Sequence, residues 1–104
     1  MHVEYIRFDL NSGTPEAFLE TWQQAHAVLR RSPLIEAIEV AQRDDRKTEF
    51  VVRVEWIDEQ ARAEYRTVPD YHEFLGMLEG YVPVSMDLFA PLITATGAGR
   101  SSAD

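Results

Sequence analysis

The chain has 104 residues, enough for one domain, and its lack of cysteine excludes disulfides, thiolate metal sites and a cysteine nucleophile. A formal net charge of −8 at pH 7, with no basic stripe to offset it, argues against nucleic-acid binding. The N-terminal segment does not resemble a signal peptide and no apolar run could span a bilayer, so we expect a cytoplasmic protein without membrane contact.

The first part of the chain predicts a strand followed by an amphipathic helix. Residues 3–10 alternate, with Ile6 and Phe8 on one face and more polar residues on the other, as in a half-buried strand. After a turn at residues 11–13, Thr14 is expected to cap a helix whose first position is Pro15. This helix should run to about residue 31, with one apolar stripe formed by Phe18, Trp22, Ala25 and Leu29.

Two further alternating segments predict an antiparallel hairpin. Residues 34–42 place Leu34, Ile38 and Val40 on one face, and a charged turn at residues 43–49 follows them. The next strand has an apolar face formed by Phe50, Val52, Val54 and Trp56. A short polar connection between two such segments is typical of neighbouring antiparallel strands.

The remaining elements are two short helices and a last strand. Asp58 is expected to begin a helix at about residues 59–66, and Pro69 a second one at about 69–79 that ends before Gly80. The apolar face of the second helix is expected to contain Tyr71, Phe74, Leu75 and Leu78. Residues 82–90 predict a strand with an apolar face of Val82, Val84, Met86 and Leu88. We expect one domain over residues 1–93 and a disordered tail over residues 94–104.

The order β-α-β-β-α-β predicts an α+β protein with the ferredoxin-like split βαβ arrangement and a four-stranded antiparallel sheet. Helices would cover one face of this sheet. The other face combines charged and aromatic side chains, among them Tyr5, Arg53, Glu55 and Phe89. Such a mixture suits a two-fold interface, so we predict a homodimer whose sheets pack face to face.

Three consecutive segments carry a resemblance to a known family. The strand end VEW, the acidic helix start IDEQARAEY and the proline-led segment VPDYHEFLGML resemble the antibiotic biosynthesis monooxygenase (ABM) family, over about residues 3–92. The resemblance implies a dimeric α+β barrel with a pocket between sheet and helices. It also implies oxidation of phenols or quinols by dioxygen without metal or flavin, although some members degrade haem.

Individual positions agree with the family only in part. Trp56 matches the tryptophan that closes the third strand in many members. Quinone-forming relatives carry asparagine and tyrosine where this chain has Val52 and Arg62. At the positions of the asparagine, tryptophan and histidine used by the haem-degrading branch, this chain has Ile6, Tyr65 and Leu75.

The candidate binding residues are aromatic. We expect a small aromatic ligand to contact five side chains: Trp22, Trp56, Tyr65, Tyr71 and Phe74. Large aromatic side chains are more often core residues, so these rings either surround a cavity or fill it.

The candidate catalytic residues are His72 and His26, which border the apolar faces of their helices. A histidine in the pocket would suit proton abstraction from a phenol near neutral pH, whereas the alternative is a surface histidine with one hydrogen bond. No histidine spacing typical of a metal site is present, and no serine has triad partners at a familiar spacing.

Two functions follow as hypotheses. The first is a monooxygenase acting on an aromatic, quinol or polyketide-like molecule, with dioxygen as co-substrate and no resident cofactor, while flavin and haem stay open as alternatives. The second is a non-catalytic dimeric module of the same fold that binds a small ligand or another protein.

Overall fold

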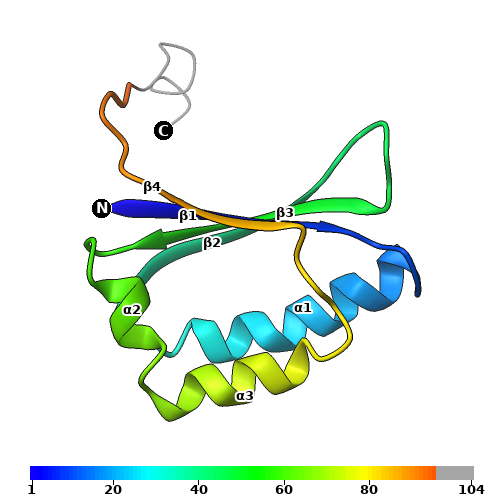
Figure 1. Ribbon diagram of the computed structural model, residues 1–104, viewed down its shortest axis with the longest axis horizontal. Helices are drawn as coiled ribbons and strands as arrows, with labels where there is room; N and C mark the ends of the chain where they lie inside the picture. Colours follow the sequence, from blue (N-terminus) through cyan, green and yellow to red (C-terminus); the bar gives the residue numbers. More distant parts are fainter. Residues whose placement is uncertain (96–104) are drawn as a thin grey trace, which may run out of the picture.

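The computed structural model describes residues 1–95, which form a four-stranded antiparallel sheet with helices against one face (Figure 1). The elements are β1 (His2–Asp9), α1 (Pro15–Leu29), β2 (Ile35–Gln42), β3 (Glu49–Trp56), α2 (Ala61–Tyr65), α3 (Pro69–Met77) and β4 (Ser85–Phe89). The strands lie in the order β2-β3-β1-β4, and every neighbouring pair is antiparallel. The predicted ferredoxin-like α+β fold is confirmed, whereas residues 96–104 of the predicted tail lie outside the described residues.

Helix α1 begins where the sequence predicted. The Thr14 hydroxyl accepts a hydrogen bond from the Ala17 backbone N–H at 3.1 Å, and Pro15 occupies the first turn, where its missing N–H costs nothing. The preceding turn passes through Gly13 at φ = 75°, a conformation that favours glycine. Helices α1 and α3 then lie side by side beneath the sheet (Figure 1).

The core lies between α1 and the two central strands. Phe18 is fully buried, with its ring centroid 5.1 Å from that of Phe8 on β1 and 4.5 Å from that of Phe50 on β3. Burial alternates strictly along β3, so that its even-numbered residues face the helices. The alternation therefore fixes the register of the central strands, because a shift by one residue would expose every buried side chain.

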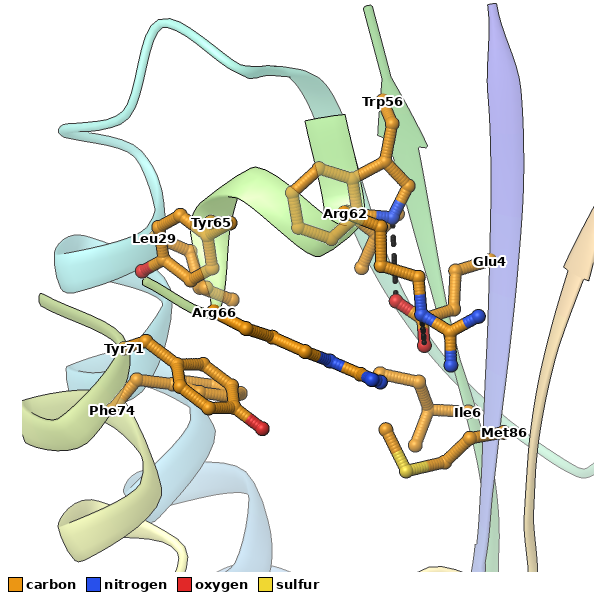
Figure 2. A pocket seen from close by; sticks show the side chains of 11 residues that line it. Glu4, Ile6, Leu29, Trp56, Arg62, Tyr65, Arg66, Tyr71, Phe74 and Met86 are labelled. Carbon is orange, nitrogen blue, oxygen red and sulfur yellow. Dashed lines mark hydrogen bonds and ion pairs between the residues drawn. The ribbon is translucent and has the colours of Figure 1, made fainter. Parts of the chain in front are cut away.

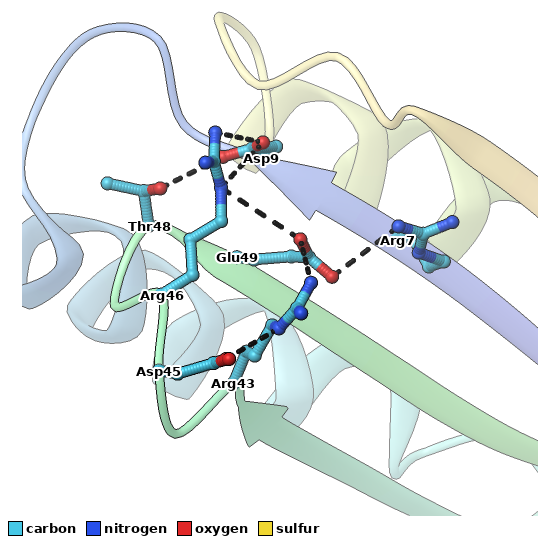
Figure 3. A network of polar contacts seen from close by, with 7 residues as sticks. All are labelled: Arg7, Asp9, Arg43, Asp45, Arg46, Thr48 and Glu49. Atoms are coloured by element: carbon cyan, nitrogen blue, oxygen red, sulfur yellow. Dashed lines mark hydrogen bonds and ion pairs between the residues drawn. The ribbon is translucent and has the colours of Figure 1, made fainter.

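A polar network holds the turn between β2 and β3 against the end of β1 (Figure 3). Asp9 accepts hydrogen bonds from Arg46 at 2.8 Å and from Thr48 at 2.9 Å, while Glu49 forms ion pairs with Arg43 and Arg7. Asp9 pairs with Glu49 at one end of the β1–β3 ladder, and His2 pairs with Trp56 at the other. The network therefore lies at the end of the sheet opposite Trp56.

Two expectations about apolar faces were wrong. Leu75 is 44% exposed, because it follows the buried Phe74 by about 100° around α3 and so lies off the buried face. The last strand begins only at Ser85, and Val82 and Val84 are exposed. Pro83 cannot donate to a strand ladder, so the segment before Ser85 reaches β1 through a single hydrogen bond from the Val84 N–H to the Arg7 carbonyl.

Candidate functional site

A small cavity opens between the sheet and the helices, at the end of the β1–β3 ladder that contains Trp56 (Figure 2). Its volume is about 40 Å³, room for one or two water molecules and not for a ring system. The lining comes from six elements and the C-cap of α2: Glu4, Ile6, Leu29, Val54, Trp56, Arg62, Tyr65, Arg66, Tyr71, Phe74 and Met86. A flavin or a haem is too large for a cavity of this volume.

Glu4 is the one carboxylate in this lining, and it is only 3% exposed. It shares the helix-facing side of β1 with Ile6 and Phe8, because side chains two residues apart in a strand point to the same face. The Trp56 indole N–H donates to Glu4 Oε1 at 3.3 Å, and Arg62 Nε lies 3.0 Å from Oε2 as an ion pair without aligned hydrogen-bond geometry. The carboxylate is therefore held from two sides in an otherwise apolar wall.

Burial raises the pKa of Glu4, and the charge of Arg62 and the hydrogen bond from Trp56 oppose that rise. The net shift is upward, so desolvation outweighs the favourable partners. A carboxylate with a raised pKa is a stronger base than one in water, and its pKa lies closer to physiological pH. The site can thus accept a proton from a weakly acidic ligand.

Helix α2 supplies three of the lining residues. Tyr65 and the C-cap residue Arg66 follow Arg62 by three and four positions, so both lie on the same side of this helix as Arg62. The helix begins at Ala61, two residues later than predicted, and the Asp58 carboxylate accepts hydrogen bonds from the Gln60 and Ala61 backbone N–H groups, both at 2.9 Å. A single capped turn therefore positions both guanidinium groups at the cavity.

The aromatic rings fill most of the space around the cavity. The ring centroids of Trp56 and Tyr65 are 5.7 Å apart, and those of Tyr65 and Tyr71 are 6.0 Å apart. The Tyr65 hydroxyl is buried without a hydrogen-bond partner among the described residues, and burial raises its pKa. In Figure 2 this hydroxyl points away from Glu4 and Arg62, so Tyr65 contributes its ring and not its hydroxyl to the cavity.

The structure brings together four of the five predicted binding residues. Trp56, Tyr65, Tyr71 and Phe74 all line the cavity. Trp22 does not, because it is buried in the core with its ring 6.0 Å from that of Phe8 and 5.7 Å from that of Phe74.

The two predicted catalytic histidines lie outside this cavity. His72 is exposed on α3, and its ring contacts that of Tyr71 from the solvent side. His26 is half-buried and borders a separate hollow between α1 and β2. Within residues 1–95, no three His, Asp or Glu side chains gather as a metal site.

Sequence reasoning missed Glu4 and Arg66, and it noted Arg62 only as a departure from relatives. A signal for Glu4 was present, because extending the alternation of Phe8 and Ile6 by one step places Glu4 on the buried face. A charged residue at such a position is rarely buried without a partner, which makes it a candidate functional residue.

The fold is shared with solved structures of low sequence identity. SnoaB, a cofactor-independent oxygenase from Streptomyces nogalater, superposes with a TM-score of 0.77 at 20% identity, over 89% of this chain and 95% of that chain. Rv0793 from Mycobacterium tuberculosis superposes with a TM-score of 0.72 at 20% identity, over 92% of this chain and all of that chain. No curated protein sequence matches this chain.

None of the helices within residues 1–95 is long and apolar enough to cross a membrane. A family profile described as antibiotic biosynthesis monooxygenase matches residues 1–76. This match spans most of the chain and includes every cavity-lining residue except Met86. As the sequence resemblance predicted, the chain belongs to the antibiotic biosynthesis monooxygenase family.

Proposed function

We propose that this protein is a cofactor-independent monooxygenase that oxidises an aromatic, quinol or polyketide-like small molecule with dioxygen. The observation that carries the proposal is Glu4, a buried carboxylate with a raised pKa in the wall of an aromatic-lined cavity. Family membership supports the reaction class. The similarity to a cofactor-independent oxygenase supports chemistry that needs no resident cofactor.

The reaction begins when the Glu4 carboxylate takes a proton from the acidic carbon or hydroxyl of the substrate. The resulting anion is delocalised over the rings and transfers one electron to dioxygen. The substrate radical and superoxide combine to form a C–O bond, and the peroxide receives the proton held by Glu4. Loss of water then leaves a carbonyl, so that one oxygen atom enters the product and the other leaves as water.

A ring system can enter only if the cavity widens, since it now measures about 40 Å³. Arg66 and Met86 are the exposed members of the lining. Their long side chains can move without disturbing the core, whereas Trp56 and Tyr65 are fixed by burial. Substrate entry therefore involves displacement of Arg66 and Met86 at the mouth of the cavity.

The direct test is oxygen uptake by the purified protein with a panel of anthrones and quinols. Glu4→Gln keeps the size of the side chain but removes the base, so we expect turnover to fall about 100- to 10,000-fold. Glu36→Gln removes an exposed carboxylate from β2 and should leave turnover unchanged.

His72→Ala and His26→Ala complete the test. Because neither histidine lines the cavity, we expect both variants to retain oxygen uptake. Loss of turnover in either variant would identify that histidine, and not Glu4, as the group that accepts the substrate proton. Full turnover in Glu4→Gln would show that Glu4 is not the base.

The small cavity also favours a second candidate, a non-catalytic module that binds a small aromatic ligand. A closed binding pocket and a filled core would both show tightly packed rings around a volume of about 40 Å³. Ligand binding without oxygen uptake across the whole panel would support this candidate over the enzyme.

A further inference from the structure

The cavity carries a positive charge in a strongly negative protein. Its lining contains two arginines, Arg62 and Arg66, and one carboxylate, Glu4, which leaves a net charge of +1 when Glu4 is ionised and the tyrosines are neutral. The whole chain has a formal net charge of −8. A ligand that enters this cavity therefore meets the opposite charge to the one that the chain carries overall.

The positive charge resides mainly on Arg66. Six arginines of residues 1–95 form ion pairs with carboxylates, namely Arg7, Arg31, Arg43, Arg46, Arg53 and Arg62. Arg62 is committed to Glu4. Arg66 has no carboxylate within ion-pair distance in the described part of the chain, although acidic residues outnumber basic ones by 18 to 10.

The position of Arg66 suits ligand binding. Its side chain extends from the end of α2 past Tyr71 and across the cavity, with the guanidinium directed toward β1, the strand that carries Glu4 (Figure 2). A guanidinium can hold a carboxylate through two parallel hydrogen bonds. The faces of Tyr71 and Phe74 lie on the other side of the same space and can contact a ring.

We propose that Arg66 binds an acidic group of the substrate, so that the ligand class is an aromatic carboxylate. One unpaired guanidinium and a net charge of +1 match a singly charged anion better than a phosphate ester. The ring would lie against Tyr71 and Phe74, and the carboxylate would face Arg66 at the mouth of the cavity. This inference rests on the proposed function in using the same cavity, but it concerns recognition and not the reaction.

The test compares two probes of the same shape, naphthalene carboxylate and the corresponding neutral carboxamide, by titration calorimetry. A charge-assisted pair predicts that the wild type binds the carboxylate about tenfold more tightly than the carboxamide. Arg66→Gln should abolish this preference while leaving carboxamide binding unchanged. Arg66→Lys retains the positive charge but not the two parallel N–H donors of the guanidinium, so part of the preference for the carboxylate should remain.

Arg30→Gln is the matched control, because Arg30 is also exposed and without a described ion pair but borders the separate hollow at His26. It should keep the full preference. Equal affinity of the wild type for both probes, failure of both to bind, or a preference that survives Arg66→Gln would each overturn the inference. Oxygen uptake plays no part in this assay, so the proposed function stands or falls separately.

Discussion

At the scale of single residues, Glu4 has the most consequences for stability as well as for function. Its pKa is raised because burial penalises the charged form more than Arg62 and Trp56 favour it. The folded protein therefore holds the Glu4 proton more tightly than the unfolded chain does. The resulting stabilisation is fully present below the ordinary glutamate pKa of about 4.3 and is lost as the pH rises through the raised value.

The Glu4→Gln variant has no titratable group at this position, so its comparison with the wild type isolates the contribution of Glu4 to the pH dependence of stability. We expect the free energy of unfolding of the wild type, minus that of Glu4→Gln, to decrease as the pH rises from about 4 toward neutrality. Urea unfolding at a series of pH values measures the difference. A difference that is constant or increases with pH would contradict the upward shift.

Asp9 provides a control of opposite sign. Hydrogen bonds from Arg46 and Thr48 lower the pKa of Asp9, so its stabilisation is present above the ordinary aspartate pKa and is lost as the pH falls through the lowered value. The difference between the wild type and Asp9→Asn should therefore increase with pH over the acidic range. Opposite trends for the two carboxylates would exclude a common effect of net charge.

The residues of the site differ in how far the sequence could predict them. Trp56 and Phe74 follow from periodicity, because alternation in β3 and the helical repeat in α3 place them toward the helix–sheet space. His72 and His26 were selected by residue type, and their distance from the cavity depends on the rotation of α3 and α1, which the sequence leaves open to within one position. Arg66 extends beyond its helix into the cavity, and no pattern predicts the direction of a long exposed side chain.

At the scale of elements, α2 determines whether the site exists. It has five residues, which is far too short for a helix to be stable by itself. Its first turn depends on Asp58, which accepts two backbone hydrogen bonds, and its end is anchored by the buried Tyr65. Any loosening of this turn would move Arg62 and Arg66 together.

Asp58→Ala should therefore affect both stability and binding. Loss of the cap is expected to lower the free energy of unfolding by about 1 kcal/mol and to weaken binding of naphthalene carboxylate. Asp44→Ala removes an exposed carboxylate from the turn between β2 and β3 and is the matched control for charge. Equal effects of the two substitutions on ligand affinity would show that α2 does not organise the cavity.

The elements themselves were predictable where local chemistry and burial agree. Thr14 and Pro15 begin α1, and the alternation in β1 and β3 identifies the central strands. Prediction failed at the edge of the sheet, where Val82 and Val84 continue an apolar alternation that the structure does not bury. An edge strand pairs with a neighbouring strand on one side only. Its apolar residues can therefore reflect contacts with a second protein, which a single chain does not contain.

At the scale of the whole molecule, one face of the sheet has no helix packed against it (Figure 1). Tyr5 packs against Phe89 on this face with ring centroids 5.5 Å apart, and Arg53 pairs with Glu55 at 2.9 Å beside them. Phe89 is nevertheless 55% exposed. A sheet face with rings and compensated charges is better suited to a second protein surface than to bulk water.

The predicted homodimer, with two such faces packed together, follows from this composition. We expect sedimentation at micromolar concentration to give a dimer, and Phe89→Glu to give a folded monomer, because the substitution places like charges opposite each other across a two-fold axis. Leu75→Glu is the control, since Leu75 is similarly exposed but lies on α3 on the helical side of the sheet. This variant should remain dimeric. A monomeric wild type, or equal loss of the dimer in both variants, would refute the face-to-face arrangement and leave the exposure of Phe89 to be explained by a different partner.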